Sequence, residues 1–177
     1  MTKPPAPVLW LMGPTSAGKT TLARRLAETL RLNGGRPVLH YDGDEIRDFF
    51  GENLDFAPDS RLKVVSTLVT LARKASGAGV LTLVSALTAH ADARELVRTA
   101  LPGALVVYVK CPIDVCARRD AKGLYRRAAA SEIDTLIGYN TEYLPPEPPD
   151  VEIDTSAADV ESCVLRLQEF LRERGIE

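Results

Sequence analysis

Short runs dominated by apolar residues alternate with amphipathic stretches along the chain. Runs in which successive residues are apolar, without alternation, are typical of strands buried on both faces of a sheet. Five such runs are expected as strands, at 8–12, 37–41, 80–87, 104–109 and 151–153. Between them apolar residues recur at helical spacing, as at Leu22, Leu26 and Leu30. The expected helices cover 20–32, 59–78, 91–100 and 157–174, and a further helix begins after Pro112.

This alternation of strands and helices predicts an α/β fold in which five parallel strands form one sheet with helices on both faces. In such three-layer folds, ligands bind at the carboxyl ends of the strands. The segment 119–150 breaks the alternation. It begins within "RRDAKGLYRRA" and ends with "LPPEPPD", which holds four of the chain's twelve prolines. We expect this segment to be a mobile lid over the site, within a single domain that spans 1–177.

Composition narrows the class of protein. A chain of 177 residues suits one domain. The net charge of −2 argues against a general nucleic-acid binder, which usually has a basic excess. Three cysteines without a Cys-x-x-Cys pair, and only two histidines, argue against a structural zinc site. Reduced thiols and the absence of a long apolar run lead us to expect a cytoplasmic protein without a membrane partner.

The stretch "GPTSAGKT" (13–20) matches the phosphate-binding pattern G-x-x-x-x-G-K-[ST]. It follows a predicted strand and opens a predicted helix, so backbone N–H groups and the helix N-terminus would surround a phosphate. Lys19 would reach the β- and γ-phosphates, and the Thr20 hydroxyl would bind Mg²⁺. The motif therefore predicts a P-loop NTPase fold that binds ATP with Mg²⁺. The loop residues expected at the ATP are Gly13, Ser16, Ala17, Gly18, Lys19, Thr20 and Thr21.

Two carboxylates follow the second predicted strand in "YDGDEIR" (41–47). Asp42 or Asp44 could hold Mg²⁺ through water, or one could accept the proton of an attacking hydroxyl. We favour Asp44 for the proton, and it would also cap the helix that follows it. Arg47, one turn further on, would bind an anionic acceptor or pair with a neighbouring carboxylate. Since no Asn-Lys-x-Asp guanine signature is present, a small-molecule kinase is favoured over a switch GTPase.

At this point the sequence resembles the adenylyl-sulfate kinase family, which phosphorylates the ribose 3′-hydroxyl of adenosine 5′-phosphosulfate (APS). The resemblance runs from Gly13 to Thr155. Its most specific parts are "DGDEIR", "LDF" followed by Arg61, "CARRDAKGLYRRA" and "VEIDT". The family pattern Cys-x-x-Arg-Asp-x-Lys-Gly-Leu-Tyr fits the chain from Cys116 to Tyr125 without a gap.

The resemblance implies an ATP-dependent kinase of sulfate assimilation, and it suggests a homodimer. It assigns the catalytic roles to Asp44, Lys19 and Lys122. Arg119 would stack on the ATP adenine, and the stretch from Thr155 would close the other side of the ring. The residues expected at the anionic hydroxyl acceptor are Asp42, Arg47, Phe56, Arg61, Ser85, Arg94, Lys122, Gly123 and Leu124.

The chain departs from the family pattern on the acceptor side. Val64 stands in place of an asparagine, Ala91 in place of an arginine, Leu136 in place of a phenylalanine, and Ser60 in place of an aspartate. Unreplaced, the first two losses would cost about 3–5 kcal/mol of acceptor binding. We expect the 3′-hydroxyl of APS as the acceptor, with a cytidine diphosphate derivative such as cytidine diphosphoramidate, or a small natural-product alcohol, as the alternative.

Two other classes of function compete with a kinase. A non-catalytic nucleotide-binding regulatory protein would be free to lose Lys19, Thr20, Asp44 and Lys122, all of which are present. A nucleic-acid binder would use the basic cluster of the lid. However, residues 131–150 contain acidic side chains and no Lys or Arg, so the cluster has no basic surface beside it.

Overall fold

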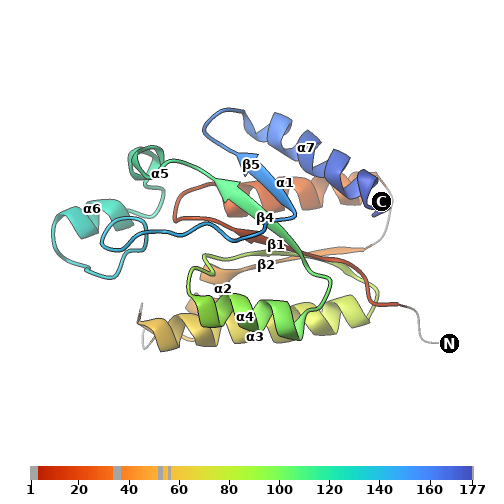
Figure 1. The fold of residues 1–177 in the computed structure, drawn as a ribbon, viewed down its shortest axis with the longest axis horizontal. Helices are drawn as coiled ribbons and strands as arrows, with labels where there is room; N and C mark the ends of the chain where they lie inside the picture. The colour runs from red at the N-terminus through yellow and green to blue at the C-terminus, as the bar shows by residue number, and fades with distance from the viewer. Residues whose placement is uncertain (1–3, 34–36, 52–53, 56, 177) are drawn as a thin grey trace.

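The computed structural model describes residues 4–33, 37–51, 54–55 and 57–176, and its centre is one parallel sheet (Figure 1). The strands are β1 (Val8–Met12), β2 (Val38–Asp42), β3 (Leu81–Ser85), β4 (Leu105–Lys110) and β5 (Val151–Asp154). Their order across the sheet is β2-β3-β1-β4-β5, with every neighbouring pair parallel. The predicted five-stranded parallel sheet is confirmed, and no strand boundary differs from its predicted position by more than two residues.

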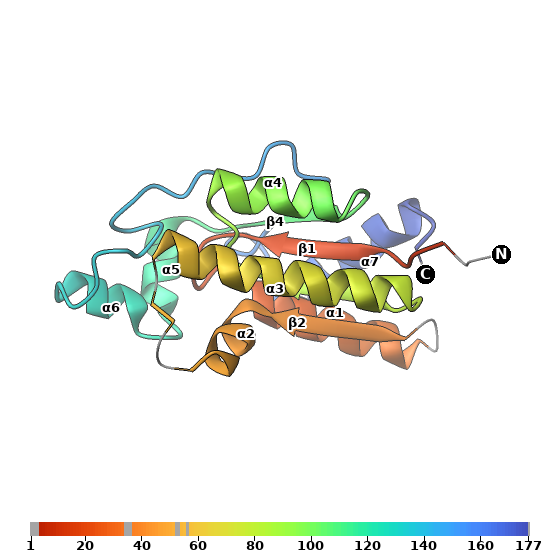
Figure 2. The same ribbon diagram turned by 90° about the horizontal axis from the view of Figure 1, so that it is seen from below.

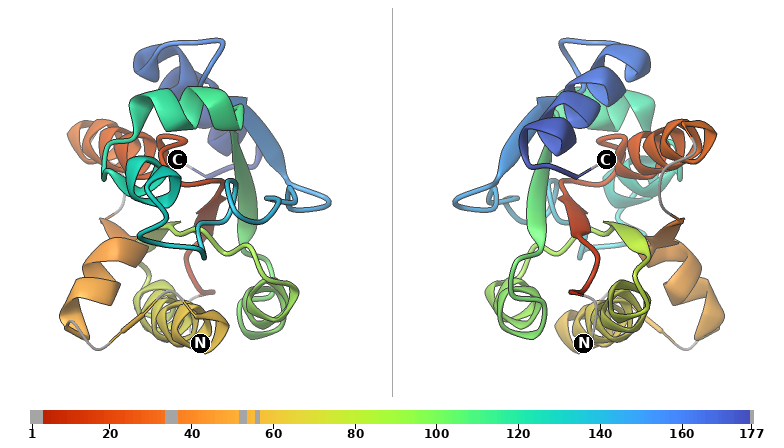
Figure 3. Two further views of the ribbon diagram at one scale, coloured as in Figure 1. Left: turned by 90° about the vertical axis from the view of Figure 1, so that its left-hand side faces the viewer. Right: turned by 90° about the vertical axis from the view of Figure 1, so that its right-hand side faces the viewer.

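Helices cover both faces of the sheet (Figure 3). One face carries α1 (Lys19–Leu32), α5 (Ile113–Arg119) and α7 (Val160–Glu173). The other carries α2 (Gly43–Phe49), α3 (Pro58–Gly77) and α4 (Ala91–Ala100). Figure 2 shows α3 and α4 side by side across that second face. In the part of the chain that the structure describes, no helix is long and apolar enough to cross a membrane.

The central strand β1 shows why its sequence is apolar at every position. Leu9 and Leu11 belong to the core that packs against α1 and α7. Val8, Trp10 and Met12 point to the opposite core, which packs against α3 and α4. Because successive side chains of a strand face opposite sides of the sheet, a strand covered on both faces needs apolar residues throughout.

The topology opens a crevice at the carboxyl ends of β1 and β3. These strands are neighbours, but α1 follows β1 onto one face of the sheet and α4 follows β3 onto the other (Figure 1). Ligand sites in open α/β sheets form where adjacent connections diverge in this way. Gly18 makes the sharp turn from the loop after β1 into α1, with φ at 96°, a conformation that favours glycine. The fold therefore places the P-loop at the crevice.

The segment 119–150 lies at the same end of the molecule as the P-loop (Figure 1). It contains a short helix, α6 (Leu124–Ala129), which the sequence analysis does not identify. The segment is anchored from several sides: the Tyr125 hydroxyl donates to the Thr15 carbonyl (3.1 Å), and Arg61 Nη2 donates to the Thr135 carbonyl (2.8 Å). Its position fits the predicted lid. That it moves, and that the chain is one domain, stay predictions.

Candidate active site

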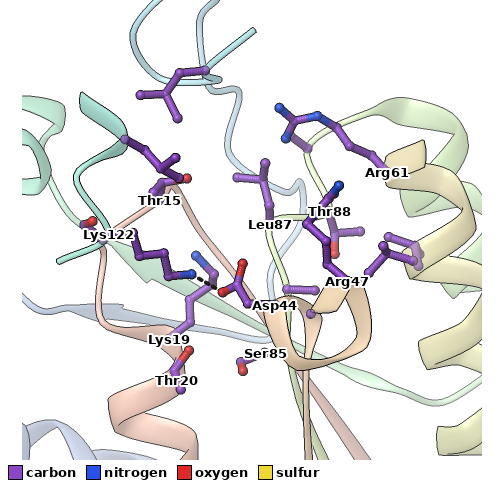
Figure 4. A pocket seen from close by; sticks show the side chains of 18 of the residues that line it. Thr15, Lys19, Thr20, Asp44, Arg47, Arg61, Ser85, Leu87, Thr88 and Lys122 are labelled. Carbon is purple, nitrogen blue, oxygen red and sulfur yellow. Dashed lines mark hydrogen bonds and ion pairs between the residues drawn. The ribbon is translucent and has the colours of Figure 1, made fainter. Parts of the chain in front are cut away.

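A cavity lies between the P-loop, α2, α3, the loop after β3 and the segment 119–150 (Figure 4). It lies at the carboxyl ends of β1 and β3, where the topology predicts a ligand. The lining includes eleven residues that the sequence analysis assigns to ATP binding, acceptor binding or catalysis: Ser16, Gly18, Lys19, Thr20, Thr21, Asp44, Arg47, Arg61, Ser85, Lys122 and Leu124. The fold thus brings together, from distant parts of the chain, the residues assigned to phosphoryl transfer.

The P-loop is arranged to receive phosphate. Lys19 Nζ donates to the carbonyls of Gly13 (2.9 Å) and Pro14 (2.7 Å), so its amine lies folded over the loop. Ser16 Oγ is buried and has no hydrogen-bond partner among the residues that the structure describes. A buried polar atom without a partner costs about 1–3 kcal/mol, and a phosphate oxygen beside Ser16 would satisfy it. Burial and the nearby Lys122 cation lower the pKa of Lys19 to about 8.

The lowered pKa of Lys19 predicts that ATP binds more weakly above about pH 8. Below that pH the amine is already protonated in the nucleotide-free protein. Above it, binding must take up a proton, since the phosphates raise the pKa of the bound amine, and affinity falls by up to about tenfold per pH unit. Phosphate groups titrate near pH 6, below this window. Isothermal titration calorimetry between pH 7 and 10 measures the decline.

The matched control for this titration is Lys19→Arg. The guanidinium of arginine stays charged across the whole window, so its ATP affinity should show no decline above pH 8. A decline of equal slope in both proteins would assign the pH dependence to another group.

Asp42 lies behind the cavity, below the P-loop. Its Oδ2 accepts hydrogen bonds from Thr20 Oγ1 (2.6 Å) and Ser85 Oγ (2.6 Å), and its Oδ1 accepts from the Asp44 backbone N–H (2.8 Å). Burial acts to raise the pKa of Asp42, but these hydrogen bonds outweigh it and hold the pKa below its ordinary value. Asp42 is 3% exposed and is not part of the cavity lining, so the structure gives no support to the predicted acceptor contact.

The same geometry corrects the predicted helix cap. The residue that caps α2 is Asp42, whose extended backbone (φ −109°, ψ 135°) precedes the first helical residue, Gly43. Asp44 is the second residue of the helix, so its carboxylate does not serve as the cap. This leaves the Asp44 side chain available to the cavity.

The oxygen atoms beside the P-loop fit the chemistry of Mg²⁺. Magnesium prefers hard oxygen ligands and usually binds through one or two protein groups together with substrate phosphates. The Thr20 hydroxyl lines the cavity at the start of α1, and the ionised Asp42 carboxylate holds that hydroxyl from behind. Thr20 is therefore suited to bind a magnesium ion that arrives with ATP.

Asp44 lies in the cavity, opposite the P-loop lysine. Its carboxylate forms an ion pair with Lys122 Nζ, which comes from the segment 119–150 (Figure 4). Both side chains are about half exposed. Figure 4 shows the amino groups of Lys19 and Lys122 close to the carboxylate of Asp44. The residues assigned to catalysis thus lie together. On one side of them is the P-loop, and on the other is the part of the cavity lined by α2, α3 and the loop after β3, which we call the far half of the cavity.

The far half of the cavity is cationic. Arg47 and Arg61 point into it from α2 and α3 (Figure 4). Burial, together with the charge of Arg47, lowers the pKa of Arg61 to about 10. Among the charged residues that line the cavity, the cations Lys19, Arg47, Arg61 and Lys122 are accompanied by one carboxylate, Asp44. Such an excess of positive charge in a partly desolvated site favours a strongly anionic ligand.

The remaining wall of the far half is largely apolar. Val64 and Leu136, two of the departures from the family pattern, both line it, whereas Ala91 does not. Sequence analysis missed other lining residues, including Thr15, Leu87 and Thr88. Trp10 Nε1 donates to Thr88 Oγ1 (2.9 Å) and fixes that side chain. Thr15 lies in the P-loop motif at one of its variable positions, whereas no motif marks Leu87 and Thr88, because their position depends on how the loop after β3 packs over β1.

Arg119 and Thr155 meet on the outer side of the P-loop. Arg119 Nη2 donates to the Thr155 carbonyl (2.6 Å), and Arg119 Nη1 donates to Thr155 Oγ1 (3.1 Å). Thr155 Oγ1 in turn donates to the Ala17 carbonyl (2.8 Å). The three residues form a contact next to the start of α1. The two residues that the resemblance assigns to the adenine therefore lie together beside the P-loop.

The other predicted acceptor residues divide into three groups. Leu124 lines the cavity, and Gly123 lies next to it as the left-handed residue before α6. Arg94 donates to the carbonyls of Thr88 (2.9 Å) and Pro145 (2.9 Å), and it is not part of the lining, so it ties the end of the segment 119–150 to α4 instead of facing an acceptor. Phe56 lies outside the residues that the structure describes.

Comparison with known proteins agrees with this site. The family model described as Adenylylsulphate kinase matches residues 6–154. A probable adenylyl-sulfate kinase of Archaeoglobus fulgidus is 40% identical over 86% of this chain and 97% of its own length. The adenylyl-sulfate kinase of Chloroflexus aurantiacus is 38% identical over 96% of this chain and 90% of its own.

A solved structure extends the agreement to three dimensions. The Mycobacterium tuberculosis APS kinase, determined in complex with AMPPNP and APS, superposes with a TM-score of 0.85 at 26% identity. The match covers 96% of this chain and 99% of that one. The matches in sequence and in structure each span most of the chain, including every element that builds the cavity. The chain belongs to the adenylyl-sulfate kinase family, whose members are ATP-dependent kinases that transfer phosphate to a hydroxyl.

Proposed function

We propose that this protein transfers the γ-phosphoryl group of ATP to the 3′-hydroxyl of APS. The observation that carries the proposal is the cavity with its four cations and one carboxylate. One pair of cations lies at the P-loop side, where a triphosphate would bind. The other pair, Arg47 and Arg61, lies in the far half of the cavity, where an acceptor would need to carry its own negative charge. The phosphosulfate of APS supplies that charge.

On the donor side, the chain supplies a phosphate cradle. Lys19 would exchange its two carbonyl partners for the β- and γ-phosphates, and Ser16 Oγ would gain the partner that it lacks. The Thr20 hydroxyl would hold Mg²⁺, which when bound neutralises the developing charge on the phosphates. Arg119 and Thr155 would flank the adenine. These groups position the phosphoryl group and stabilise its charge, and such effects dominate catalysis of phosphoryl transfer.

On the acceptor side, Asp44 would accept the proton of the attacking hydroxyl. Its carboxylate lies between the P-loop and the far half of the cavity, which is where the hydroxyl must approach the γ-phosphate in line. In the structure Lys122 neutralises Asp44. With both substrates bound, Lys122 would turn to the transferring phosphoryl group, which frees Asp44 to act as the base.

The segment 119–150 would cover the bound substrates. It supplies Lys122, Leu124 and Leu136 to the cavity and is held to α3 by Arg61, a residue that we also assign to the acceptor. Acceptor binding at Arg61 would therefore be linked to the position of the segment. Closure of the segment excludes water, which would otherwise accept the phosphoryl group and hydrolyse ATP.

The apolar part of the cavity would hold the adenine base of APS. Val64, Leu87 and Leu136 offer it dispersion contacts and desolvation in place of polar recognition. Nonpolar walls discriminate weakly between bases, because they form no hydrogen bonds with the polar edge of a base. For this reason the acceptor test must include a cytidine nucleotide as well as APS.

The test is the rate of ADP release with a panel of acceptors at fixed Mg²⁺ and ATP. The panel contains APS, adenosine 5′-monophosphate, cytidine diphosphoramidate and a set of small alcohols. We expect APS to give the highest kcat/KM. We expect AMP to fall well below it, because AMP lacks the sulfate group. A cytidine derivative or an alcohol that exceeds APS would show that the acceptor is a different molecule.

Arg61→Ala tests the acceptor assignment separately from the donor site. Hydrogen bonds to a charged group contribute about 1.5–3 kcal/mol, so kcat/KM for APS should fall by roughly 10- to 100-fold. The KM for ATP should change by less than about twofold, since Arg61 enters the cavity from α3 and not from the P-loop. Steady-state kinetics with each substrate varied in turn measures both constants.

The matched control for this variant is Arg98→Ala, on the exposed surface of α4, where Arg98 pairs with Glu95. It should leave both constants unchanged. Equal increases in the KM for ATP and for APS in the Arg61→Ala variant would contradict an acceptor-specific role for Arg61.

Three further parts of the account remain predictions. Magnesium dependence follows from the assignment of Thr20 and would be lost on chelation with EDTA and restored by added Mg²⁺. The homodimer and the cytoplasmic location rest on the family resemblance and on composition. Analytical ultracentrifugation of the purified protein tests the homodimer, and fractionation of the source cells tests the cytoplasmic location.

A further inference from the structure

A histidine outside the cavity is connected to the P-loop by a continuous chain of hydrogen bonds. His40 Nε2 lies 2.8 Å from Ser85 Oγ. Ser85 Oγ lies 2.6 Å from Asp42 Oδ2, which is also 2.6 Å from Thr20 Oγ1. These hydrogen bonds therefore connect His40, through Ser85 and Asp42, to the Thr20 hydroxyl, which we assign to magnesium. His40 itself is not part of the cavity lining.

The sheet fixes this arrangement. In the parallel pairing of β2 with β3, Asp42 lies opposite Ser85 and His40 lies opposite Leu83. His40 and Asp42 are two residues apart on β2, so their side chains project from the same face of the sheet. The Ser85 hydroxyl reaches both of them from the neighbouring strand. Two paired strands therefore hold all three residues in a fixed register.

The protons that these groups carry determine which group donates in each hydrogen bond. The ionised carboxylate of Asp42 can only accept, so the protons of both hydroxyls, Ser85 and Thr20, point toward it. Ser85 has one proton, and it is used in this bond. Its oxygen can then only accept from His40, so the His40 imidazole must carry a proton on Nε2. His40 is therefore the outer donor on one side: its bond to Ser85 strengthens the bond that Ser85 donates to Asp42, and the Thr20 hydroxyl donates to the same carboxylate from the other side.

We propose that His40 is a positioning residue for the magnesium site, acting through Ser85 to hold the Asp42 carboxylate in the orientation that receives the Thr20 hydroxyl. This inference rests on the proposed function, since it concerns the residue that would bind Mg²⁺ with ATP. Without the Nε2–H donor, Ser85 could turn its proton away from Asp42. The carboxylate would then lose one of the two bonds that fix Oδ2, and Thr20 would be held less well.

The kinetic test compares three replacements of His40. His40→Leu removes the donor, His40→Gln places an amide N–H close to the Nε2 position, and His40→Asn is too short to reach it. Groups behind a metal ligand commonly contribute 10- to 100-fold to metal affinity, and His40 lies further out than these. We therefore expect the Mg²⁺ concentration for half-maximal rate to rise about three- to tenfold in the Leu and Asn variants and to return toward the parent value in the Gln variant. The KM for APS should stay unchanged.

Leu39→Gln is the matched control on the same strand. Leu39 is exposed, and its side chain leaves the face of β2 opposite to that of His40. It should not alter the Mg²⁺ response. A parent-like Mg²⁺ response in the Leu variant, or a Gln variant no better than Leu, would overturn the proposal.

A second test uses the nucleotide-free protein and does not depend on activity. The chain has two histidines, so one variant, His90→Gln, assigns both imidazole signals in a long-range ¹H–¹⁵N spectrum. At about pH 8, above the ordinary pKa of histidine, we expect His40 to be the Nε2–H tautomer. In Ser85→Ala, which removes the acceptor, His40 should shift toward a mixture of tautomers. An Nδ1–H tautomer in the parent protein would contradict the proton direction and overturn the proposal.

The two tests separate this inference from the proposed function. If the parent enzyme did not phosphorylate APS but His40 showed the Nε2–H tautomer and its dependence on Ser85, the proposed acceptor would fail while the hydrogen-bond chain would stand. If the parent enzyme were active on APS and the His40 variants kept its Mg²⁺ response, the positioning role would fail while the function would stand.

Discussion

Replacing Lys19 by alanine is expected to abolish turnover, with kcat/KM for ATP falling by at least about 10³-fold. The amine lies folded over the P-loop and would reach the β- and γ-phosphates. It would stabilise charge that grows on these phosphates as the phosphoryl group leaves, in a site that the segment 119–150 is proposed to shield from water. No other lining cation comes from the P-loop itself, since Arg47, Arg61 and Lys122 come from α2, α3 and the segment 119–150.

ADP release at saturating APS measures this loss. Lys74→Ala, at an exposed position near the end of α3, removes the same charge from the chain without touching the cavity and should keep parent activity. Equilibrium binding of a non-hydrolysable ATP analogue completes the comparison. If Lys19→Ala kept more than a tenth of the parent kcat, the phosphates would have to lie elsewhere than on this loop.

The replacement Asp44→Asn is expected to lower kcat by about 10²- to 10⁴-fold, the usual contribution of a general base. Asparagine has nearly the same shape as aspartate, so the packing of α2 should be retained. The amide cannot accept the hydroxyl proton. Asp44 lies near Lys19, but in the described part of the chain its carboxylate pairs with Lys122 and Lys19 donates to the loop carbonyls, so the affinity for the ATP analogue should change by less than about threefold. Single-turnover kinetics isolates the chemical step.

Asp48→Asn is the matched control for Asp44→Asn. Asp48 lies on the exposed side of the same helix, so the substitution removes an equal charge at a similar place in the sequence. Its kcat should equal that of the parent. A variant Asp44→Asn with normal kcat but weaker ATP binding would contradict the role of Asp44 as base and would point to a role in nucleotide binding.

Much of the fold could be predicted because its signals are local. The five-residue run of β1 is apolar at every position because its side chains contribute to both hydrophobic cores. The pattern of apolar residues therefore indicates directly that both faces of the sheet are covered. The P-loop is a contiguous motif that follows this strand and begins α1. The side of the cavity near Lys19 and Thr20 is therefore defined by a single stretch of sequence.

The parts that sequence analysis missed depend on contacts between distant residues. Arg94 ties α4 to Pro145, and nothing near Arg94 in sequence indicates that partner. The sequence favours Asp44 as the cap of α2, because it directly precedes "EIRDFF", but Asp42 also accepts hydrogen bonds from Thr20 and Ser85 and is fixed in place by them. His40 gives no local signal, since a histidine inside a strand has no motif. Its contact with Ser85 exists only in the register of β2 with β3.

On the acceptor side, the sequence identifies individual positions but not the contacts that surround them. Sequence analysis identifies Val64 and Leu136 as departures, and the structure places both in the cavity wall. A change of residue type shows which contact is lost. It does not show which neighbours compensate, and that depends on residues such as Leu87 and Thr88, which the loop after β3 brings into the same wall.

The product of the reaction tests the central claim most directly. The purified protein is incubated with Mg²⁺, ATP and APS, and the product is examined by ³¹P NMR and mass spectrometry. The account predicts a species one phosphoryl group heavier than APS, formed in equal amount to ADP, whose new phosphomonoester signal couples to the ribose 3′-proton. A signal coupled to the 2′-proton, or ADP formation without a phosphorylated nucleotide, would contradict it.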